Sequence, residues 1–125
     1  MSPIRRLALA AALLALAGST AACGSSAALG QAKSACVNIN RSLATLKASA
    51  APGLTPAASA ALVAKAQSQL LAALPAASRA TSADGSFNSL MTTIQEADRV
   101  PEGLLVDSLS RQCQVVFSNT PYLGI

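Results

Sequence analysis

The chain has 125 residues, enough for one domain with a modest hydrophobic core. It contains no His, which excludes Ser-His and Cys-His nucleophile pairs and the usual zinc sites. The formal net charge is +4, but the basic residues form no run and no aromatic residues interleave with them, so the composition argues against nucleic-acid binding. Ala and Leu, both strong helix formers, dominate the chain and favour an all-α fold.

The first 22 residues have the organisation of a secretory signal peptide. Arg5 and Arg6 give a short positive segment, and residues 7–17 that follow are apolar and uncharged. This apolar segment is shorter than the roughly 20 residues that a membrane-spanning helix needs. The sequence therefore predicts an exported protein whose leader comprises residues 1–22.

The leader ends in a short motif, Thr20-Ala21-Ala22-Cys23. It resembles the lipobox of bacterial lipoproteins, with Thr20 at a position where Leu or Val is commoner. The resemblance implies that Cys23 is lipidated and becomes the first residue of a protein held on the extracytoplasmic side of the cell membrane. The alternative is ordinary signal cleavage, which would leave Cys23 as a free thiol or in a disulfide and the protein secreted without lipid.

Residues 23–28 form a short tether between this cysteine and the first apolar helical position, Leu29. The five residues after Cys23 reach at most about 18 Å, so the domain that follows is expected close to the membrane surface. That domain is predicted to span residues 29–118, with an irregular tail at 119–125.

Apolar residues recur at steps of three and four over four segments, which is the spacing of amphipathic helices. Residues 51–53 predict a turn after the first helix, Thr55 and Pro56 predict the start of the second, and Pro101 separates the third from the fourth. Residues 75–85 fit either a short helical turn or a loop. Four such helices predict a small up-down four-helix bundle. The expected core positions are Leu29, Ala32, Cys36, Ile39, Leu43, Leu46 and Ala50, then Val63, Ala66, Leu70 and Ala73, then Phe87, Leu90, Ile94 and Ala97, and finally Val106, Leu109, Cys113 and Val116.

Two polar residues are placed by the same local rules. Ser86 precedes the third helix and is expected to cap it with its hydroxyl. Glu102 follows Pro101 and is expected in the first turn of the fourth helix, where a negative charge suits the helix dipole.

Cys36 and Cys113 remain as an even pair once Cys23 is assigned to the anchor. Each lies on the apolar face of its own helix, and the first and fourth helices are neighbours in an up-down bundle. An exported protein can form disulfides, so we expect these two cysteines to be joined. The alternative is two buried thiols in reduced form. Redox catalysis is not expected, because no Cys-x-x-Cys spacing lowers a thiol pKa.

The remaining residues form no recognisable catalytic, metal or cofactor site. The acidic residues make no ready carboxylate pair, and neither a Ser-x-x-Lys motif nor a Gly-rich phosphate loop is present. The sequence therefore predicts a non-enzymatic protein with no cofactor. Two functions stay open: a helical domain that binds or supports another envelope protein, and a carrier of a small ligand or lipid in a cavity between the helices.

Overall fold

The computed structural model of the chain describes residues 25–118. The predictions for the leader, for Cys23 and for the tail at 119–125 lie outside the described residues. The predicted tether at 23–28 was too long, because α2 begins at Ser25 and Ala28 is buried in the core. Within the described range, no helix is both long enough and apolar enough to cross a membrane.

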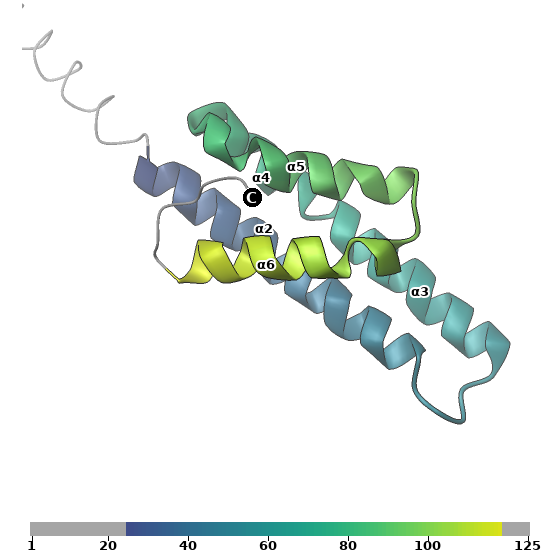
Figure 1. Cartoon of the computed structure of the whole chain (residues 1–125). Coiled ribbons are helices and arrows are strands. Elements are labelled where there is room, and N and C mark those ends of the chain that lie inside the picture. Colours follow the sequence, from purple (N-terminus) through teal and green to yellow (C-terminus); the bar gives the residue numbers. More distant parts are fainter. Residues whose placement is uncertain (1–24, 119–125) are drawn as a thin grey trace, which may run out of the picture.

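All the regular elements of the described residues are helical, and the predicted all-α four-helix bundle is confirmed. Helices α3 and α4 are separated only by Ala72 and Ala73 and form one kinked arm, so the bundle has four arms: α2, α3–α4, α5 and α6. Successive arms run in opposite directions (Figure 1). The helices are α2 (Ser25–Ser49), α3 (Pro56–Leu71), α4 (Leu74–Ala83), α5 (Asn88–Gln95) and α6 (Val106–Phe117), and the 3-10 turns are η1 (Gly85–Phe87), η2 (Glu96–Asp98) and η3 (Glu102–Leu104).

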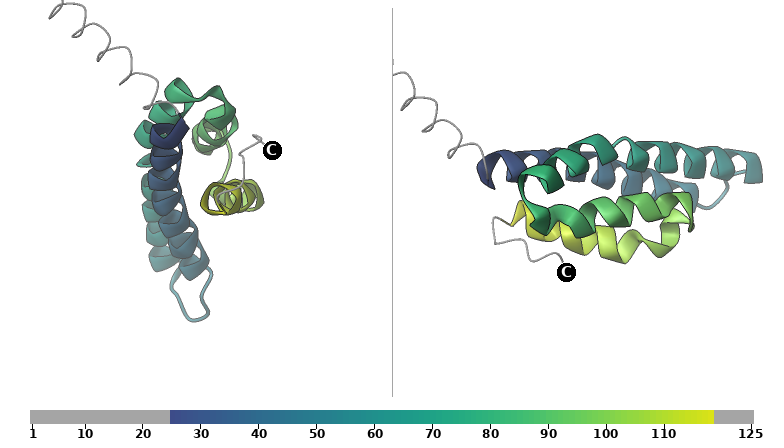
Figure 2. Two further views of the ribbon diagram at one scale, coloured as in Figure 1. Left: turned by 90° about the vertical axis from the view of Figure 1, so that its left-hand side faces the viewer. Right: turned by 90° about the horizontal axis from the view of Figure 1, so that it is seen from above.

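The four arms pack as two layers. Helix α2 lies beside the α3–α4 arm in one layer, and α5 and α6 form the second layer against it (Figure 2). Helix α2 contacts α3, α4 and α6, so it connects the two layers. At one end, α2 and α3 extend beyond α5 and α6 and keep one face uncovered (Figure 2).

The kink between α3 and α4 follows from Pro75. Proline has no amide hydrogen and cannot continue the helical hydrogen bonds of the preceding turn. Pro75 therefore stands in the first turn of a new helix, which runs to Ala83. The sequence pattern of residues 75–85 was compatible with either a short helical turn or a loop. Most of this segment is helical, and α4 buries Ala76, Ala77 and Ala80.

The core is built mainly from small side chains, and most of the expected core positions are buried. Two of the expected core positions were predicted wrongly, because Ala50 is exposed and Val63 is 42% exposed. Helix α2 ends at Ser49, before Ala50, and Val63 lines an open hollow together with Val100 and Glu102 instead of lying in the core. The polar Ser42 and Ser49 are buried on α2 instead.

Two of the three local signals predicted from the sequence are confirmed, a cap at Thr55 and a break at Pro101. Thr55 caps α3 as predicted, since its Oγ1 accepts a hydrogen bond of 3.1 Å from the amide of Ala58. Pro101 has an extended conformation and separates η2 from η3, as expected. The prediction for Ser86 was wrong, because the cap is Asp84, whose Oδ1 accepts from the amide of Ser86 at 3.0 Å. A short 3-10 turn precedes α5, which moves the capping position two residues back along the chain.

Candidate functional site

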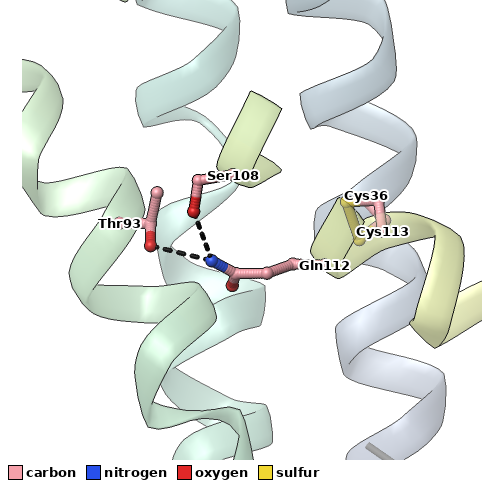
Figure 3. The surroundings of a disulfide bond; sticks show 5 residues. All are labelled: Cys36, Thr93, Ser108, Gln112 and Cys113. Carbon is pink, nitrogen blue, oxygen red and sulfur yellow. Dashed lines mark hydrogen bonds between the residues drawn. A yellow bond between two sulfur atoms is a disulfide. The ribbon is translucent and has the colours of Figure 1, made fainter. Parts of the chain in front are cut away.

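Cys36 and Cys113 form the predicted disulfide. Their Sγ atoms are 2.14 Å apart and their Cα atoms 5.5 Å apart. Both residues are buried, and the bond joins α2 in one layer to α6 in the other (Figure 3). Of the predicted site residues, these two are brought together, and the lipidation site Cys23 lies outside the described residues.

A hydrogen-bonded amide lies beside the disulfide on α6 (Figure 3). Gln112 is 3% exposed, and its Nε2 donates to Thr93 Oγ1 on α5 and to Ser108 Oγ on α6, both at 3.0 Å. These bonds use both amide protons of Gln112, which satisfies its buried nitrogen. The disulfide and the hydrogen bonds of Gln112 therefore connect α2, α5 and α6.

Glu102 does not lie in the first turn of the fourth helix as predicted, because α6 begins only at Val106, and it takes part in a second polar cluster. Glu102 lies in η3 and is 6% exposed. Its Oε1 is hydrogen-bonded to the hydroxyl of Ser42 on α2, which is fully buried. Pro101 has an extended conformation between η2 and η3, and the hydrogen bond between Ser42 and Glu102 connects η3 to α2.

The Ser42–Glu102 cluster consists of Ser42, Glu102 and the carbonyl of Ala66 on α3. Ser42 Oγ lies 2.5 Å from the carbonyl oxygen of Ala66, and it is also within hydrogen-bond distance of Glu102 Oε1. The cluster therefore links α2, α3 and η3 at one point. A serine hydroxyl has a single proton, so it cannot fully satisfy two acceptor oxygens.

A further oxygen of this cluster has no donor. Glu102 Oε2 and Gln69 Oε1 are the two side-chain atoms that are buried without a hydrogen-bond partner among the described residues. Burying a carboxyl oxygen in this way costs free energy, because it loses its hydrogen bonds to water. Buried polar atoms without partners are uncommon in folded proteins, so this atom marks the cluster as a candidate binding site.

Glu102 also lines a hollow of about 270 Å³. Its walls are mainly apolar and include Leu46, Val63 and Val100. The amide of Gln67 closes one side by donating to the carbonyl oxygen of Ala97 at 3.2 Å. Gln69, the other residue with an unpartnered buried oxygen, does not line this hollow. The hollow and the carboxyl group therefore form one candidate site.

A shallower groove lies on the other side of Leu46. Its volume is about 400 Å³, and Leu43, Lys47 and Val106 are among its lining residues. Leu46 belongs to both concavities, so the groove and the hollow are adjacent on the molecular surface.

The sequence contained a signal for Ser42 but not for Glu102. Ser42 lies three residues after Ile39, so it falls on the buried side of the helix. A serine there had to find a buried partner, as Ser42 does. Nothing near Glu102 in the sequence distinguishes it from a solvated acidic residue, because its partner on α2 is 60 residues away.

The described residues contain no group of three or more His, Cys, Asp or Glu side chains arranged to hold a metal ion. Comparison with known proteins finds no matching family model, no matching curated protein and no matching solved structure. A function for this chain therefore rests on its own residues and geometry.

Proposed function

We propose that this chain is a non-enzymatic lipoprotein of the cell envelope whose helical bundle binds another envelope protein. Lipid on Cys23 would hold the domain on the extracytoplasmic side of the membrane. The lipobox-like motif supports the anchor, and the start of α2 at Ser25, two residues after Cys23, would keep the domain close to the membrane. The observation that carries the binding role is an exposed apolar surface at the end of the bundle where the two layers do not overlap.

Leu104 is the most exposed of the large apolar residues among the described residues. Its side chain is 74% exposed in η3, and it follows Gly103, which lines the hollow together with the 42%-exposed Val63. The groove beside Leu46 and Val106 continues the apolar surface. Exposed apolar residues beside apolar concavities on a small domain are typical of a protein-binding site.

Photocrosslinking in intact cells tests the binding role. A photoreactive amino acid at position 104 is expected to capture a discrete partner that the same group at position 79 does not capture. Arg79 is exposed on α4. Helix α4 lies towards the opposite end of the bundle from the connection between α5 and α6, which contains η3 (Figure 1). Equal capture at the two positions, or no capture at position 104, would contradict the proposal.

Metabolic labelling with a clickable fatty acid tests the anchor separately. The protein is expected to incorporate the label and to fractionate with membranes, and Cys23→Ala is expected to lose both properties. Unchanged labelling and fractionation in Cys23→Ala would remove the lipoprotein proposal. A soluble wild-type protein without label would support secretion without lipid.

A second candidate function, a carrier of a small ligand, is favoured by the hollow beside Glu102. Its volume of about 270 Å³ is at the lower end of ligand pockets, which occupy roughly 300–1,000 Å³. This size suits a small molecule better than a whole lipid. Native mass spectrometry of gently purified protein is expected to show a bound mass, and a bare polypeptide mass would count against this function.

A further inference from the structure

We propose that the hollow beside Glu102 binds a small amine, with the ammonium group on the Glu102 carboxyl group and the apolar part against Leu46, Val63 and Val100. This inference rests on the second candidate function, the small-ligand carrier. It names the chemical class of the ligand and the residue that selects it.

The first argument is a shortage of hydrogen-bond donors. Ser42 Oγ is in hydrogen-bond contact with the carbonyl oxygen of Ala66 and with Glu102 Oε1, but it has one proton to donate. Glu102 Oε2 is buried and has no partner among the described residues, so the Glu102 side chain, which lines the hollow, must rotate slightly before a ligand there can reach this oxygen. A ligand that binds here is therefore favoured if it carries N–H groups, and an ammonium group carries three.

The second argument concerns charge. Glu102 is the one charged residue among the described residues that line the hollow, so no basic side chain in these walls pairs with it. The carboxyl group is 6% exposed, and a buried carboxylate is stabilised mainly by a cation with which it also forms hydrogen bonds. An amine ligand supplies both the positive charge and the donors.

The third argument concerns size and polarity. A hollow of about 270 Å³ with mostly apolar walls accommodates a small hydrocarbon group together with its amine. Leu46 and Val100 are partly buried and Val63 is exposed at the rim, so the apolar part can bury surface without a rearrangement of the core.

The test uses the full chain in phosphatidylcholine nanodiscs, so that detergent does not compete for the hollow. Benzylamine, benzyl alcohol and benzoate serve as probes, because they share a ring and differ in the head group. Binding is followed by NMR through the methyl signals of Val63, Val100 and Leu46. Benzylamine is expected to bind about tenfold or more tightly than benzyl alcohol, and benzoate is expected not to bind.

Two variants and a matched control locate the selectivity. Glu102→Gln is expected to bring the affinities for benzylamine and benzyl alcohol to within about threefold of each other, because the amide keeps the shape but carries no charge. Val63→Trp is expected to reduce binding of both probes by filling the rim. Glu96→Gln makes the same chemical change at an exposed position on η2 and is expected to leave the preference unchanged.

The outcomes separate this inference from the function on which it rests. Equal binding of benzylamine and benzyl alcohol by the wild-type protein overturns the amine site but leaves a small-ligand carrier. No methyl shift with any probe overturns the amine site and counts against the carrier. The comparison of probes on the wild-type protein stands even if Glu102→Gln fails to fold.

Discussion

At position 102 a carboxyl group lies between α2 and α3 with too few hydrogen-bond donors around it. Ser42 supplies the one hydroxyl proton of the cluster, and Glu102 Oε2 has no partner among the described residues. Burying such a carboxyl group lowers the stability of the fold unless other interactions offset the loss of its hydration. The energetic consequence can be measured apart from any ligand.

Ser42→Ala is expected to lower the free energy of unfolding by about 1–3 kcal/mol, because it removes the only donor shared by two buried acceptors. Glu102→Met removes the carboxyl group and is expected to cost little or to stabilise the fold. In the double variant, the loss caused by Ser42→Ala should be smaller than in the wild-type background. Urea denaturation of the four proteins checks this, and strictly additive effects would show that the two side chains do not interact.

Gly53 and Gly30 provide a matched pair at the level of single residues. Gly53 has a φ of +85° in the turn before α3, whereas Gly30 lies within α2, and an added Cβ meets nothing within 4 Å at either position. Gly53→Ala is therefore expected to destabilise the fold by about 1–2 kcal/mol through backbone strain alone. Gly30→Ala is expected to stabilise it by about 0.5–1 kcal/mol. Thermal unfolding monitored by circular dichroism checks both, and shifts of the same sign would contradict the assignment.

At the scale of elements, the cap at Thr55 and the break at Pro101 were predicted from the sequence, whereas the cap before α5 was not. Thr55 and Pro101 act at their own positions in the chain, so their neighbours in sequence were sufficient to assign them. The cap before α5 depends on a 3-10 turn that the periodic pattern of apolar residues does not predict. Asp84, and not Ser86, therefore provides the capping side chain.

Asp84 is expected to make this start dependent on pH. The pKa of its carboxyl group is held below the ordinary value of 3.8, chiefly by the hydrogen bond from the backbone N–H of Ser86 and then by the Ser86 side chain. Since the folded pKa is lower than the unfolded one, the contribution to stability is complete above the unfolded pKa and disappears as the pH falls through the folded pKa. The difference in unfolding free energy between the wild type and Asp84→Ala should therefore shrink from about pH 6 to about pH 2.5. Denaturant titrations across this range check it, and a constant difference would show that the cap is not ionised.

At the scale of the whole molecule, a thin core makes the disulfide important. Many of the buried side chains are alanines, which bury little apolar surface each. The bond between Cys36 and Cys113 closes a loop with a sequence separation of 77 and ties the two layers together.

Replacing both cysteines by alanine is expected to lower the free energy of unfolding by about 4–5 kcal/mol, which is the loop-closure entropy for this separation. That loss is comparable to the whole stability of a small domain. Chemical denaturation of the double variant, compared with the wild type before and after reduction, measures it. A loss below about 1 kcal/mol would mean that packing alone holds the layers together.

The sequence alone determined the all-α class and the four helical segments in which apolar residues recur at steps of three and four. It also determined the breaks at residues 51–53 and 101 and the pairing of Cys36 with Cys113. Helical periodicity and turn preferences depend on residues close together in the chain, so the local sequence pattern was sufficient to predict these features. The pairing of the two cysteines required only the expected order of the helices in the bundle. The burial of Glu102, the exposure of Val63 and the hollow beside them were decided only by the tertiary structure. Whether a side chain is covered depends on where the second layer ends and on which distant residue faces it, as Ser42 faces Glu102 across 60 residues of chain.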